Sequence, residues 1–182
     1  IGALSGLRVI DLGWVAAAPM VTKYLAQFGA EVIKIESITR PDPLRSMSPY
    51  KDGILGIERS GFFAFANSGK RSLSLDLTTP RGIEIARDLI SKSDVLVENF
   101  RPGVIDKLGL GYESLRKMKE DLIMLSISIL GRGGIYDKFA GWAPHGSAAS
   151  GYFELTGWPD GEPTGLIGAA VPGDWGMPPF GS

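Results

Sequence analysis

The stretch VLVENFRPGVIDKLGLG, residues 95–111, decides the fold of this 182-residue chain. An apolar run at 95–97 is followed by a polar corner at 98–103, and a short helical pattern then closes on a glycine. Strand, turn and helix in this order, with Pro102 and Gly103 at the break, indicate a βα unit. Ligands of parallel α/β sheets collect at such corners. The corner is therefore either part of a ligand site or only a well-formed turn, because turn chemistry alone explains the Pro and Gly.

The segments on either side of this stretch alternate between strand and helix patterns. The expected helix that precedes it begins with Thr79 as N-cap and Pro80 in the first turn. The strands are expected at 7–12, 31–35, 72–76, 95–99 and 122–129, and the helices at 16–28, 61–67, 79–93 and 104–108. This alternation predicts the α/β class, with a Rossmann-like parallel sheet covered by helices on both faces.

Composition limits the classes of protein to consider. Hydrophobic residues make up 44% of the chain, which is enough for a globular core. A net charge of −1 without a basic tail gives no reason to expect nucleic acid. The chain has no cysteine and one histidine, so we expect neither thiol catalysis nor a metal site. No apolar run reaches the length of a membrane span and no signal peptide is visible, so the default expectation is a soluble cytoplasmic protein.

Two segments carry less regular patterns. Residues 37–60 form a long loop with three prolines, which is expected to be functional or to cover part of the fold. Asp11, near the end of the first strand, can face a ligand or cap a turn. The glycine fingerprint of a dinucleotide site is missing, because the corner after the first strand contains only Gly13, so a standard NAD site is rejected.

Taken in order, several motifs resemble those of the class III (CaiB/BaiF) CoA-transferase family. The motifs share their order and spacing with that family and span nearly the whole chain. They are LSGLRVIDL at 4–12, GAEVIKIE at 29–36, NSGKRSLSLDL at 67–77, SDVLVENFRPGVIDKLGLGYESLRKM at 93–118, SISILGRGG at 126–134 and SGYFELTGWPDGEPTG at 150–165.

The resemblance implies a CoA-binding Rossmann-like domain at residues 1–150. It implies that a Gly/Pro-rich segment at 151–182 carries the catalytic acid and begins the remainder of a longer protein. Family members are about twice as long, so the chain is expected to correspond to their N-terminal half and to lack their second, small domain. Members also form interlocked dimers, so the expected partner is a second copy or another chain that completes the fold.

The resemblance also implies a chemistry. The family's catalytic acid follows a glycine-rich run, which places it at Asp174 here. Its carboxylate would attack an acyl-CoA thioester to give a mixed anhydride, and the CoA thiolate would return to form an aspartyl-CoA thioester. An acceptor acid would then take the CoA, so the expected substrates are acyl-CoA and carboxylic acids.

The family's CoA contacts come from the first βα corner, the third strand and the 98–103 corner. By motif these are Val15, Ala16, Leu75, Asn99, Phe100, Val104 and Lys107. Two cations that are common in the family are replaced here by Ser37 and Thr78. The missing positive charge is expected to come from Arg40, Arg45, Lys70 or Arg71.

Three functions remain open at this point. The first is CoA transfer through Asp174, the second is CoA binding without turnover, and the third is a structural fragment that needs a partner chain. Racemisation of acyl-CoA is disfavoured, because Trp142 stands where that branch of the family has its acid/base histidine and cannot carry a proton. His145, three residues later, is more simply a structural residue.

Overall fold

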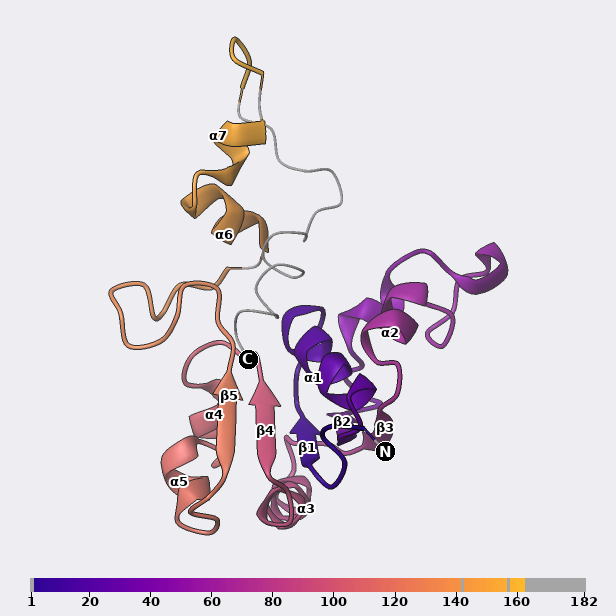
Figure 1. Cartoon of the computed structure of the whole chain (residues 1–182), viewed down its shortest axis with the longest axis vertical. Coiled ribbons are helices and arrows are strands. Elements are labelled where there is room, and N and C mark those ends of the chain that lie inside the picture. Colours follow the sequence, from indigo (N-terminus) through magenta and orange to yellow (C-terminus); the bar gives the residue numbers. More distant parts are fainter. Residues whose placement is uncertain (1, 142, 157, 163–182) are drawn as a thin grey trace.

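Five parallel strands form one sheet in the computed structural model, which describes residues 2–141, 143–156 and 158–162 (Figure 1). Their order across the sheet is β3-β2-β1-β4-β5. The strands are β1 Arg8–Asp11, β2 Glu31–Glu36, β3 Arg71–Ser74, β4 Val95–Glu98 and β5 Ile123–Ser126. In the centre, Val9 pairs with Val32 on one side and Val95 on the other. The predicted parallel α/β sheet is confirmed.

Each expected helix is present, although each is shorter than the pattern suggested. The helices are α1 Ala17–Gln27, α2 Gly61–Ala66, α3 Pro80–Ser91, α4 Val104–Lys107, α5 Tyr112–Arg116, α6 Ala143–Ala149 and α7 Tyr152–Thr156, with 3-10 turns η1 Pro43–Ser46 and η2 Lys51–Gly53. Thr79 caps α3 as predicted, because its hydroxyl accepts the backbone N–H of Gly82. Three short helices, α5, α6 and α7, were not predicted.

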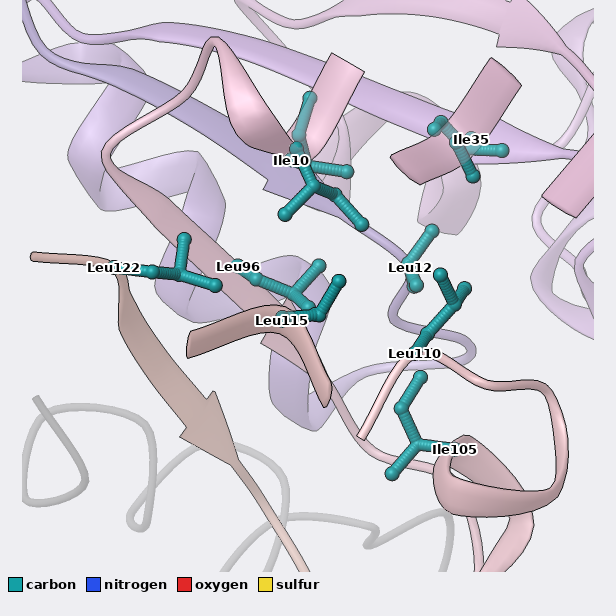
Figure 2. Close-up of a cluster of buried hydrophobic side chains, with 10 residues drawn as sticks. Ile10, Leu12, Ile35, Leu96, Ile105, Leu110, Leu115 and Leu122 are labelled. Atoms are coloured by element: carbon teal, nitrogen blue, oxygen red, sulfur yellow. The ribbon is translucent and has the colours of Figure 1, made fainter. Parts of the chain in front are cut away.

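The two faces of the sheet carry different side chains. Ile10, Leu12 and Leu96 point to one face, where they pack with Ile90 of α3 and with the apolar residues of α4 and α5, including Ile105 (Figure 2). The valines of the central strands point to the other face and pack against α1. Since helices cover both faces at the centre of the sheet, β2, β1 and β4 are largely buried, whereas the edge strands β3 and β5 stay partly exposed.

Most strand bounds differ from the sequence prediction by a single residue, and two strand ends differ by more. The fifth strand was expected to run to residue 129, but β5 ends at Ser126, and the N–H of Ile127 still donates to the carbonyl of Glu98 in β4. The third strand was expected at 72–76, but β3 ends at Ser74, because the carboxylate of Asp76 accepts the N–H of Thr78 and begins a turn. Local turn bonding thus shortens the edge strand β3.

Part of the long loop 37–60 packs against α1 and α2. Leu44 of η1 is buried with Met20 of α1 and Ala66 of α2. By contrast, α6 and α7 lie beyond the carboxyl ends of the strands, away from the sheet (Figure 1). No helix within the described residues is long and apolar enough to cross a membrane.

Candidate functional site

A cleft of about 640 Å³ opens at the carboxyl ends of the strands. Its walls come from the corner after β1, the start of loop 37–60 after β2, residues 75–78 after β3, and the 98–103 corner with α4. The 98–103 corner is therefore part of a cleft as well as a turn. Ligand sites of open parallel sheets lie at this edge.

Five of the seven predicted CoA-contact residues line this cleft. They are Val15, Leu75, Asn99, Phe100 and Val104. Ala16, at the N-cap of α1, and Lys107, exposed on α4, do not line it. The predicted catalytic residue Asp174 lies outside the described residues.

Side chains hold every backbone N–H of the corner 13–15. The N–H of Gly13 donates to Asp11 Oδ1 at 2.8 Å, and that of Val15 donates to Asp42 Oδ1 at 3.0 Å. Between them, Asn99 accepts the N–H of Trp14 and donates to its carbonyl, both at 2.8 Å. In dinucleotide-binding folds such N–H groups face phosphate. Here they are already bonded within the protein, which agrees with the rejection of an NAD site.

Val15 adopts a left-handed backbone conformation, with φ of +61°. For a β-branched residue this conformation is a true outlier, and it costs about 1–2 kcal/mol. Strained residues of this kind persist where their surroundings over-determine them, often at ligand sites. Val15 lines the cleft and also packs against the Met20 and Leu44 cluster.

Two buried ion pairs stand behind the corner. Lys70 Nζ lies 2.8 Å from Asp11 Oδ2, and Lys34 Nζ lies 3.1 Å from Asp42 Oδ2, with all four side chains at most 2% exposed. Burial raises the pKa of Asp11, but Lys70 and Lys34 outweigh burial and hold it below its usual range. Burial lowers the pKa of Lys70 to about 8, although Asp11 opposes this shift. Asp11 therefore caps the turn, one of the two roles considered from sequence.

Glu36, the acid at the end of β2, is also bonded within the protein. In NAD-binding folds an acid near this position binds the ribose hydroxyls. Glu36 instead accepts two bonds from the guanidinium of Arg45, at 2.6 and 3.0 Å, and one from the N–H of Asp42 at 3.1 Å. Burial raises the pKa of Glu36, but Arg45 outweighs burial and lowers it overall. Glu36 is thus neutralised rather than presented to a ribose diol.

Two arginines supply the positive charge of the cleft. Arg40 and Arg101 both line it. The guanidinium carbon of Arg40 lies 5.4 Å from the centre of the Trp14 ring. Of the four cations considered from sequence, Arg40 lines the cleft, whereas Arg45 and Lys70 are held in buried ion pairs and Arg71 pairs with Glu31 at the sheet edge.

Aromatic and apolar groups form the rest of the wall. Phe100 meets Trp14 edge to face, with ring centres 6.2 Å apart. Next to it, the fully buried Glu98 accepts the N–H of Phe100 and pairs with Arg132, and burial raises the pKa of this carboxyl. His145 lies on α6 and meets Phe139 edge to face, and it does not line the cleft.

Sequence reasoning missed Trp14, Arg101 and the role of Asp42. No motif marked them, although an acid two residues after Arg40 in a long loop was a possible signal. Lys34 was also missed, yet a lysine inside an apolar strand of a doubly covered sheet must be buried and paired. Among the described residues, no group of three or more acidic or histidine side chains is arranged to hold a metal.

Comparison with known proteins gives consistent matches. The family model described as CoA-transferase family III matches residues 4–175. The chain is 41% identical to a succinate–glutarate CoA-transferase of Agrobacterium fabrum and 39% identical to an acetyl-CoA:oxalate CoA-transferase of Acetobacter aceti, over 88% and 93% of its length. It spans 40% and 42% of those two relatives. A crystal structure of a CaiB/BaiF family protein from Brucella suis matches 99% of the chain with a TM-score of 0.84 and 34% identity, and the match covers 49% of that protein.

Proposed function

Because the chain belongs to CoA-transferase family III, we propose that it forms the CoA-holding part of an enzyme that moves CoA between carboxylic acids. The observation that carries this proposal is the cleft, in which five residues expected to contact CoA come together from three separate segments of the chain. The relatives whose names state such transfers are longer than this chain. The complete transfer activity is therefore also proposed here.

The chemistry of the cleft suits a phosphorylated adenosine better than an NAD ribose. CoA carries a phosphate on its ribose, and an arginine near the end of β2 is the group that accommodates a ribose phosphate in related folds. Arg40 stands there, four residues after the neutralised Glu36. Phe100 offers an apolar aromatic surface for the adenine, and Arg101 a second cation.

Asn99 also has a structural role at the cleft. Both ends of its side-chain amide bond to the backbone of Trp14. It therefore holds the wall of the cleft, and its contact with CoA stays a prediction. Ala16 and Lys107 do not line the cleft, and their contacts with CoA also stay predictions.

The proposed transfer step runs through Asp174 in the segment that follows residue 150. Its carboxylate oxygen attacks the thioester carbon, the carbon–sulfur bond breaks and CoA leaves as thiolate. The thiolate then attacks the aspartyl carbonyl of the anhydride, releasing the donor acid and leaving an aspartyl-CoA thioester. The acceptor carboxylate takes over the CoA through a second anhydride, and Asp174 is regenerated.

The test begins with calorimetric titration of CoA, with NAD as a control ligand. Micromolar binding of CoA and none of NAD is expected. Replacing Arg40 and Arg101 by Met should weaken CoA binding at least tenfold, which corresponds to about 1.4 kcal/mol. Arg81→Met, on the exposed side of α3, is the matched control and should leave binding unchanged. A folded protein that binds NAD equally well, or ignores both arginines, would contradict the proposal.

Trapping separates transfer from binding alone. After treatment with an acyl-CoA, mass spectrometry of the peptide that contains Asp174 should show a CoA adduct, which Asp174→Asn abolishes. CoA binding without an adduct for any acyl-CoA tested would favour the second function, a CoA-binding relative without turnover. Adduct formation only after a second chain is added would favour completion by a partner.

A further inference from the structure

The corner 13–15 and loop 37–60 meet at one buried carboxylate. Asp42 is fully buried, and its Oδ1 accepts both the N–H of Val15 and the N–H of Leu44, each at 3.0 Å. We infer that Asp42 is a positioning residue for the cleft, which fixes the left-handed Val15 wall and the loop that carries Arg40 relative to one another. This inference rests on the proposed function and names the residue that shapes its site.

The two bonds have different purposes. The bond to Leu44 caps η1 and is a common local arrangement for an aspartate. The bond to Val15 joins residues 27 apart and is not needed by η1. It satisfies the amide of a residue whose backbone is strained, and it does so at the wall of the cleft. Capping alone therefore does not account for the position of Asp42.

Lys34 compensates the buried charge of Asp42. Its ammonium lies 3.1 Å from Asp42 Oδ2 and also donates to the carbonyl of Gly13 at 2.5 Å. The pair thus holds the corner at two points, through Gly13 and through Val15. An unpaired buried carboxylate would be costly, so the charge and the hydrogen bond must be separated in any test.

Arg40 lies in the loop segment that Asp42 anchors. It lies two residues before Asp42, whose own N–H donates to Glu36 Oε2 at 3.1 Å. Glu36 is fixed in turn by Arg45. Val15 is therefore bonded to the anchored carboxylate of Asp42, and Arg40 precedes that residue by two positions in the same loop. Removing the hydrogen bonds of Asp42 is expected to displace both Val15 and Arg40 in the cleft wall.

Two double variants separate the hydrogen bond from the charge. Lys34→Met with Asp42→Asn removes both charges and keeps an oxygen that accepts the Val15 N–H. Lys34→Met with Asp42→Ala removes both charges and the acceptor. The first should bind CoA within about threefold of the unchanged protein, and the second at least tenfold more weakly. Ser60→Ala is the control, because Ser60 anchors the same loop through Leu44 and Met47 without contacting the corner.

A second readout does not need CoA. Hydrogen exchange at the Val15 amide, followed by NMR, should be at least tenfold faster in the Asp42→Ala double variant than in the Asp42→Asn one. Equal exchange rates in the two variants, or equal CoA affinities, would overturn the inference. If the unchanged protein binds no CoA, the proposed function fails, and the exchange rates still decide whether Asp42 holds Val15.

Discussion

Replacing Lys70 by Met tests how much the buried charges behind the cleft stabilise the fold. The Lys70 ammonium has three acceptors, Asp11 Oδ2 and the carbonyl of Pro19 at 2.8 Å and the amide oxygen of Asn67 at 2.9 Å. Removing one partner of a buried pair costs about 3–5 kcal/mol. Asp11 keeps its bonds from Gly13 and Thr22, so we expect the lower end, about 3 kcal/mol.

The assay is equilibrium unfolding in urea at pH 7, followed by circular dichroism. Lys92→Met is the matched control, because Lys92 and Asp88 form a pair one helical turn apart and both are more than 60% exposed. It should cost about 0.3–0.5 kcal/mol. A loss below about 1 kcal/mol for Lys70→Met, or one equal to that of the control, would refute the reasoning.

The pH dependence gives the same prediction an independent check. In the unchanged protein the pKa of Lys70 is about 8, below its unfolded value of 10.5, so the folded state releases this proton first and gains stability as pH rises through that window. Lys70→Met lacks this gain. It also leaves the Asp11 carboxylate less compensated, which raises the pKa of Asp11. The folded variant therefore loses stability as pH rises. The difference in unfolding free energy between the two proteins should therefore grow with pH.

Three further outcomes are expected. Arg132→Met should raise the pKa of the buried Glu98 further, so the folded state takes up that proton more readily as pH falls, and the stability lost in urea should be smaller at pH 5 than at pH 8. Gly82→Ala should destabilise by about 1–3 kcal/mol in thermal unfolding, despite the better helix propensity of Ala, because a Cβ there would collide with a backbone carbonyl. Asn99→Ala should cost about 2–3 kcal/mol in urea, since it loses both bonds to Trp14, whereas Asn99→Asp keeps the acceptor and should cost less.

The sheet could be predicted because its strands are apolar runs set off by clear helix signals. Thr79 and Pro80 marked the start of α3, and Gly29, with φ of +104°, marked the end of α1. The short helices α6 and α7 gave no such signal. They are seven and five residues long and lie beside glycines, so no periodic apolar face identified them.

The candidate site was predicted through motifs and only partly through chemistry. The resemblance led to Val15, Leu75 and Phe100, which do line the cleft. The buried pair of Lys34 and Asp42 was missed, because a lysine in a strand looks like a surface residue until both faces of the sheet are known to be covered. The role of Lys34 is decided by its place in the folded sheet and not by the local sequence pattern.

The amide pair between Asn99 and Trp14 has a consequence for the order of folding. The two residues are 85 apart in the chain, and they come together only after β4 has docked beside β1. The unit of β1, α1 and β2 needs only short loops, whereas β4 must close a much longer one, and such distant pairings generally form slowly. We therefore expect the wall of the cleft to be completed late, so that during refolding the Trp14 amide becomes protected from exchange after the amides of β2.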